Sequence, residues 1–130
     1  MTGQPIPEDI RRFILTSIPS VPHVEGLLLL RGAPNEPWDA RRLGQRLYVN
    51  DQTAATVLRD LHEIGALEAS AQHPATYRYA PRADELRSLI DRLADVYTHH
   101  LVEVTHLIHS GLNKKAQQFA DAFIWRIKDG

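Results

Sequence analysis

The sequence has 130 residues, which is the size of one ordinary domain with room for a small appended element. Its 43% apolar and 24% charged residues are close to the globular average, so the composition excludes general disorder. Fifteen basic and sixteen acidic residues leave a formal charge of −1, without the strong positive balance that indicates a nucleic-acid partner. The absence of cysteine excludes disulfides and thiolate metal sites.

The N-terminal segment MTGQPIPEDI has neither a basic cluster nor a long apolar run, so it does not match a secretion signal. The longest apolar stretch, GLLLL, is far shorter than the roughly 20 residues that a membrane span needs. We therefore expect a cytoplasmic protein with no membrane partner.

The first third of the chain predicts two helices. In the first, Pro7 is followed by two acidic residues, which favour a helix N-terminus, and by an apolar stripe at helical spacing. Ser20 is the expected N-cap of the second helix, which runs from Val21 to Arg31 and ends at Gly32. The segment APNEP then predicts a loop, because two prolines in four residues disfavour a helix.

The central segment predicts a pair of short helices joined by a tight turn. Asp39 is the expected cap of a helix that ends near Leu47. After YVN, Asp51 is the expected cap of a second helix, which Gly65 stops. ALEASAQ and TYRYAP alternate as strands do, with HPA between them, so a small β-hairpin follows directly.

The order of helix, helix, turn, helix and hairpin resembles a winged helix-turn-helix. Residues 38–82 carry the resemblance, and the helix Val21–Arg31 completes a three-helix core. VLRDLHEIGAL is similar to bacterial regulators of the MarR, ArsR and PadR kinds, and FADAF at Phe119–Phe123 resembles a group of small proteobacterial winged-helix proteins. The resemblance implies a mainly α fold with a small β-hairpin wing and a winged helix-turn-helix core, plus a long C-terminal helix or helical hairpin.

From Asp84 to Ser110 no proline or glycine interrupts the chain, which predicts one helix of about 27 residues, roughly 40 Å long. Its apolar residues recur at spacings of 3 and 4, with one histidine among them, as in a heptad seam. We expect the seam to mediate homodimerisation; the alternative is an intrachain hairpin with the last helix. The expected organisation is a winged helix-turn-helix domain with its N-terminal helix at 1–82 and a helical dimerisation region at 83–130, where Phe119, Phe123 and Trp125 are further anchors. The seam residues are Leu86, Ile90, Leu93, Tyr97, His100, Val104 and Leu107.

The resemblance implies a homodimeric transcriptional regulator that binds double-stranded DNA, with a recognition helix at about 51–63 in the major groove. The side chains of that helix that face outward can hydrogen-bond to base edges, and nearby arginines can hold phosphates. The candidate DNA-binding residues are Arg41, Arg42, Arg46, Gln52, Thr53, Thr56, Arg59 and Arg78. Six arginines against five acids in 38–82 weigh against DNA, as does Asp60 beside Arg59. The alternative is a protein-interaction adaptor without DNA binding.

Four histidines lie between His99 and His109. His99, Glu103 and His106 are the set with metal-ligand spacing, but a solvated histidine surface explains the cluster more simply, and a response to pH is a further alternative. No GxGxxG, GxxxxGK, HExxH or GxSxG motif occurs, so we expect neither an enzyme nor a bound cofactor.

Overall fold

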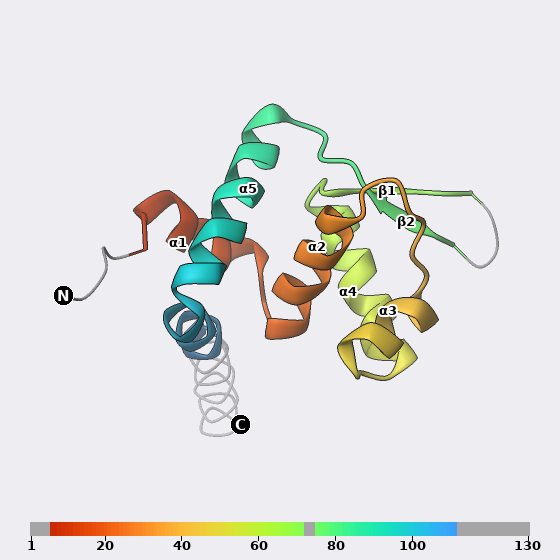
Figure 1. The fold of residues 1–130 in the computed structure, drawn as a ribbon, viewed down its shortest axis with the longest axis horizontal. Helices are drawn as coiled ribbons and strands as arrows, with labels where there is room; N and C mark the ends of the chain where they lie inside the picture. The colour runs from red at the N-terminus through yellow and green to blue at the C-terminus, as the bar shows by residue number, and fades with distance from the viewer. Residues whose placement is uncertain (1–5, 72–74, 112–130) are drawn as a thin grey trace, which may run out of the picture.

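The computed structural model describes residues 6–71 and 75–111 of the chain. In chain order its named elements are α1 (Glu8–Ser17), α2 (Val21–Gly32), α3 (Ala40–Leu47), α4 (Asp51–Glu63), β1 (Leu67–Ala69), β2 (Tyr77–Tyr79) and α5 (Asp84–His99). A further helical segment occupies 101–111. Figure 1 shows α1 beside α5 at one end of the molecule, α3 and α4 with the hairpin at the other, and α2 between them.

The arrangement is a mainly helical winged helix-turn-helix, as the sequence predicts. β1 and β2 pair antiparallel, with Leu67 opposite Tyr79 and Ala69 opposite Tyr77. A feature that the sequence does not predict is a third short pairing, in which Trp38 and Tyr77 exchange two backbone hydrogen bonds of 2.8 Å. The hairpin is therefore paired with the residue just before α3, and the side chain of that residue, Trp38, is buried.

Side-chain caps begin three of the helices. Ser20 and Asp39 accept hydrogen bonds from the backbone N–H groups three residues later, as predicted. The predicted cap of α4 is wrong: Asn50 is the N-cap, with its side-chain oxygen 2.7 Å from the N–H of Thr53. Asn50 has the extended backbone that a cap requires, whereas Asp51 is already the first helical residue and complements the helix dipole.

One hydrophobic core joins the two ends of the molecule, and α2 runs through it. Val24, Leu27 and Leu30 are fully buried and belong to the same cluster as the apolar faces of α1, α4 and α5. Gly26 allows α2 to approach α4 closely, because a Cβ at this position would lie 3.1 Å from Val57 Cγ1. The position of α4 is thus set by packing against α2.

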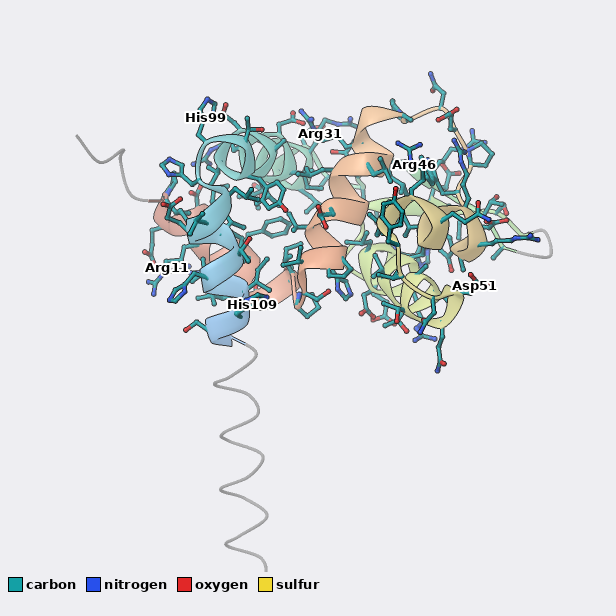
Figure 2. The ribbon with its side chains drawn as sticks, turned by 60° about the horizontal axis from the view of Figure 1, so that its bottom comes forward. Arg11, Arg31, Arg46, Asp51, His99 and His109 are labelled. Atoms are coloured by element: carbon teal, nitrogen blue, oxygen red, sulfur yellow. The ribbon has the colours of Figure 1, made fainter. Side chains whose placement is uncertain are left out.

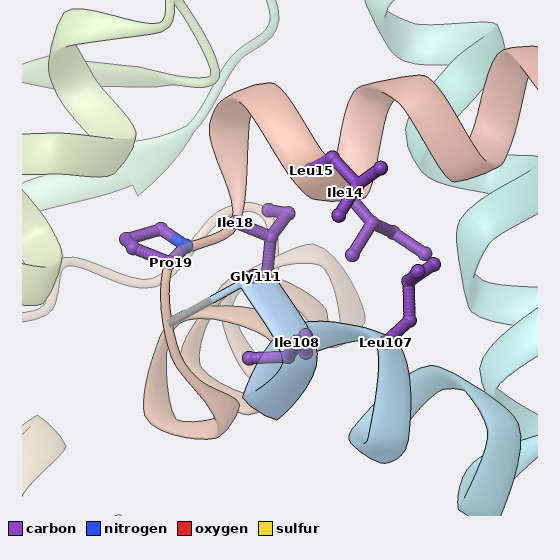
Figure 3. A pocket seen from close by; sticks show the side chains of 7 residues that line it. All are labelled: Ile14, Leu15, Ile18, Pro19, Leu107, Ile108 and Gly111. Atoms are coloured by element: carbon purple, nitrogen blue, oxygen red, sulfur yellow. The ribbon is translucent and has the colours of Figure 1, made fainter. Parts of the chain in front are cut away.

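The prediction of one continuous helix from Asp84 to Ser110 is wrong. α5 ends at His99, and His100 has φ −133° and ψ 45°, outside the helical region, before the chain becomes helical again. A straight helix of that length would run past this small core, whereas the break lets Val104 and Ile108 become buried. Figure 3 shows Leu107 and Ile108 facing Ile14 and Ile18 from α1 and the turn after it.

No single helix in the described ranges is long and apolar enough to cross a membrane; α1 and α2 together reach that length only across a bend of 109°.

Candidate nucleic-acid interface

The exposed side of α4 carries polar side chains opposite a buried apolar side. Ala54, Val57, Leu58 and Leu61 are buried against the core. Gln52, Thr53 and Arg59 are exposed, and Thr56 is half-buried. The guanidinium of Arg59 lies 3.4 Å from the Thr56 hydroxyl, which makes a weak contact along the helix surface. The four predicted reading residues therefore come from the solvent-facing part of one helix.

The carboxylate of Asp60 contacts a residue of α2. Its Oδ2 lies 2.9 Å from Nε2 of His23, a buried histidine of α2 that is 6% exposed. On the other side of the same ring, Nδ1 contacts the hydroxyl of Ser20, the cap of α2. Asp60 thus belongs to the link between α2 and α4, so the sequence-based objection that it offsets Arg59 on the outer face loses much of its weight.

The three arginines of α3 have different surroundings. Arg41 is exposed, whereas Arg42 lies 3.9 Å over the Trp38 ring and donates to the Pro37 carbonyl at 2.8 Å and to Glu36 at 3.1 Å. Arg46 is exposed and lies 5.8 Å from the same ring, at the edge of a cation–π contact. Arg42 therefore connects α3 to the loop residues Glu36 and Pro37 and to the Trp38 ring. Arg41 and Arg46 have fewer contacts and are more accessible to a phosphate.

The wing brings one further cation into the region. Arg78 is exposed on β2, and its direct cross-strand partner on β1 is Glu68. An acidic residue opposite the arginine reduces the positive potential of this face of the hairpin. Figure 2 shows Arg46 and Asp51 in the half of the molecule that contains α3, α4 and the hairpin, away from His99 and His109.

Tyr48 lies at the turn between α3 and α4 and was not among the residues that the sequence suggested. It is 95% exposed and caps α3 in the left-handed conformation, with φ 59° and ψ 42°. The sequence predicts only a turn for YVN. The available signal was a large aromatic where a helix C-cap usually has glycine or asparagine.

The predicted dimerisation seam is partly occupied within the chain. Ile90, Leu93 and Val104 are buried in the core of the same molecule, and the other four residues are half-buried. Two exposed apolar side chains lie on the segment after the break, where Leu101 is 51% and Val102 74% exposed. The predicted anchors Phe119, Phe123 and Trp125, and the FADAF phrase, lie outside the described residues.

The histidines of the C-terminal region do not gather into a metal site in the part of the chain that is described. His99 Nδ1 lies 2.9 Å from the backbone oxygen of Asp95 and 3.4 Å from its carboxylate. Glu103 pairs instead with His100, at 3.6 Å. The break at His100 separates His99 from Glu103 and His106, so the one-face spacing expected of a continuous helix is not realised.

Solved structures similar to this chain share its fold. The homodimeric winged helix-turn-helix DNA-binding domain of Mb0332 from Mycobacterium bovis, a possible ArsR-family regulator, matches 78% of this chain and 94% of its own at 21% identity, with a TM-score of 0.51. The PcaV transcriptional regulator from Streptomyces coelicolor matches 92% and 85% at 19% identity, with a TM-score of 0.50. No protein-family model and no curated protein sequence matches the chain. At these identities the similarity establishes the winged helix-turn-helix fold.

Proposed function

We propose that this protein is a sequence-specific DNA-binding transcriptional regulator that acts as a homodimer. The observation that carries the proposal is the outer side of α4, where Gln52, Thr53 and Arg59 project from a helix whose opposite side is locked into the core. A rigid helix with hydrogen-bonding side chains near its N-terminus is what major-groove reading requires. The similar M. bovis domain is described as both DNA-binding and homodimeric, which agrees with this proposal.

Within this function the residues divide into two roles. Gln52, Thr53, Thr56 and Arg59 read base edges: the Gln amide is suited to adenine, the Thr methyls to thymine, and the Arg guanidinium to guanine or a phosphate. Arg41, Arg46 and Arg78 hold phosphates on either side of the groove. Arg42 contributes mainly by keeping the Trp38 junction rigid, since its guanidinium already has three partners.

A homodimer would double these contacts, which the small charge margin makes necessary for useful affinity. The exposed Val102 shares a surface hollow near one end of the molecule with the half-buried Leu107 and Ile6, and Arg11, Glu103 and His106 line its polar part. Leu101, which precedes Val102 in the chain, is also exposed, and these four apolar residues form what we call the apolar surface. We propose that the dimer contact lies on this surface, with Tyr97, the half-buried seam residue near the C-terminal end of α5, at its margin.

The test is a gel shift of the full chain on DNA from upstream of its own gene, at roughly 50 and 200 mM salt, with random-sequence competitor. We expect a shift that survives the competitor and weakens steeply with salt. The matched variants are Arg59→Ala on α4 and Arg12→Ala on the exposed side of α1, of which only the first should lose the specific shift. Absence of any shift at the lower salt would contradict the proposal.

A protein-interaction adaptor is the second candidate, and the exposed apolar pair Leu101 and Val102 is the observation that favours it. The two functions predict different results for one variant. If the protein is an adaptor, the unchanged protein should not bind DNA, and Val102→Glu should abolish binding of its protein partner. In a regulator, the same variant should convert a DNA-binding dimer into a weakly binding monomer.

A further inference from the structure

Tyr48 combines two features that make tyrosine an unfavourable residue for stability at this position. A left-handed backbone costs conformational energy for any side chain with a Cβ, and for a large aromatic it is uncommon. The side chain also recovers almost nothing by burial, because it is 95% exposed. Among the described residues it is the only one other than glycine with a positive φ. Strained positions that a fold nevertheless retains are concentrated at functional sites.

The turn leaves little freedom for any other backbone path. The Val49 N–H donates a hydrogen bond of 3.0 Å to the Gly44 carbonyl, and the Tyr48 N–H donates to the same carbonyl. A Cβ on Gly44 would lie 2.8 Å from the Val49 carbonyl oxygen, so α3 and the turn are in close contact. The tight turn therefore imposes the left-handed conformation at position 48, where asparagine or glycine would satisfy it with less strain.

Position 48 is at the edge of the face proposed to meet DNA. Tyr48 follows α3 directly and precedes by three residues the first residue of α4, which places it within about 11 Å of Asp51 along the backbone. Arg46 is exposed two residues before it. α4 begins on the other side of the turn, where Asp51 already complements the helix dipole, so the positive charge available to a phosphate beside Tyr48 comes from Arg46.

We infer that Tyr48 is a DNA-backbone contact, in which its phenolic hydroxyl donates a hydrogen bond to a phosphate beside the groove that α4 enters. Tyrosine is one of the side chains that proteins use for such contacts, and they fix the register of the protein without reading sequence. The inference rests on the proposed DNA-binding function and adds to it a residue that orients α4. The ring gives the hydroxyl reach, and the rigid turn limits the entropy lost on contact.

The experiment compares Tyr48→Asn and Tyr48→Phe with the unchanged full chain, in thermal unfolding and in DNA binding. Asparagine tolerates the left-handed region, so Tyr48→Asn should raise Tm by roughly 2–5 °C. The same variant should lose about tenfold in affinity for both the upstream DNA and a random duplex, because a phosphate contact is independent of sequence. Tyr48→Phe retains the ring and the strain, and should lose about fivefold in affinity with an unchanged Tm.

The outcomes separate this inference from the function on which it rests. If the unchanged protein binds DNA and both variants bind equally well, the Tyr48 contact is wrong and the proposed function stands. If Tyr48→Phe binds as the unchanged protein does while Tyr48→Asn is weaker, the hydroxyl contact is also wrong. If the unchanged protein binds neither duplex at low salt, the proposed function fails, and the inference fails with it.

Discussion

The imidazole of His23 and the carboxylate of Asp60 lie 2.9 Å apart and join α2 to α4 across 37 residues of sequence. The ring is almost completely buried, and its other nitrogen contacts the hydroxyl of Ser20. All partners are satisfied when Nε2–H donates to Asp60 and the hydroxyl donates to Nδ1. The link therefore holds the C-terminal half of α4 against the helix that runs through the core.

Removing the acceptor of this link should destabilise the fold. Asp60→Ala leaves the buried Nε2–H of His23 without a partner, and we expect a loss of about 1–3 kcal/mol in the free energy of unfolding. Urea denaturation measures it. Glu63→Gln, an exposed change on the same helix, is the control and should stay within about 0.5 kcal/mol of the unchanged protein. Equal stability of Asp60→Ala and the control would show that the link contributes nothing.

Two neighbouring arginines of α3 should behave differently when truncated. Arg42→Ala removes a cation from the Trp38 ring and two further contacts, so it should lower the free energy of unfolding by about 1 kcal/mol. Arg41→Ala removes an exposed side chain and should leave stability unchanged. In DNA binding, Arg41→Ala should weaken all sequences alike and reduce the salt slope by about 1. Urea denaturation and a salt titration of affinity check the pair.

A smaller salt slope for Arg42→Ala than for Arg41→Ala would reverse these roles. The sequence predicts a phosphate contact for Arg42 just as it does for Arg41, because helical spacing shows which residues are outward but not which of them already have partners. Glu36, Pro37 and Trp38 precede Arg42 by only four to six residues. That proximity becomes a contact only once Trp38 is pinned by its pairing with Tyr77.

Local patterns predicted the helix-turn-helix and hairpin well because their signals are local. The predicted helix at about 51–63 matches α4, and Ser20 and Asp39 cap as expected. The sequence does not predict the break at His100, because alternating spacings of 3 and 4 fit one straight helix and two shorter helices equally well. The packing of Ile108 near Ile14 of α1 decides between these two structures, and this is a contact between distant parts of the chain. The His23–Asp60 link is non-local in the same way.

Arg59 should carry sequence discrimination. We expect Arg59→Ala to weaken binding to the preferred site by about 1–3 kcal/mol, with a smaller loss on random DNA, because a lost base contact removes specificity as well as affinity. Gel shifts on the preferred site and on random DNA give the ratio of the two affinities, which measures specificity. Its control is Arg41→Ala, which should leave that ratio unchanged. The assignment of this face would be lost if Arg59→Ala weakened both duplexes equally.

The ion pair between Asp9 and Arg92 should make stability depend on pH in the acid range. Arg92 makes two hydrogen bonds to the carboxylate, and these are the main reason that the pKa of Asp9 is lowered from its usual 3.8. A carboxyl whose pKa is lowered by folding stabilises the folded state above the unfolded pKa, and this contribution is lost as the pH falls through the folded value. The stabilisation from Asp9 should therefore be complete at neutral pH and disappear below about pH 4.

Thermal unfolding as a function of pH tests this relationship. Asp9→Asn should lower Tm at pH 7, and the difference from the unchanged protein should shrink as the pH falls below 4. Glu8→Gln is the matched control, because its carboxylate lies at a looser 3.9 Å from Arg11 and both groups are exposed. A Tm difference for Asp9→Asn that persists at pH 2 would assign the effect to helix packing and not to charge.

The apolar surface after the helix break should be the dimer contact. Val102 is 74% exposed, and beside it lie the exposed Leu101 and the half-buried Leu107. Val102→Glu adds a charge to this surface without disturbing the core, so the variant should change the mass in light scattering from twice the chain mass of 14.7 kDa to a single chain mass. Thr98→Glu places the same charge on an exposed polar position of α5 and should remain dimeric. If Val102→Glu stays dimeric while Tyr97→Glu becomes monomeric, the dimer contact lies on the heptad seam instead. In that case the half-buried part of the seam forms the interface, although Ile90 and Leu93 are buried within one chain.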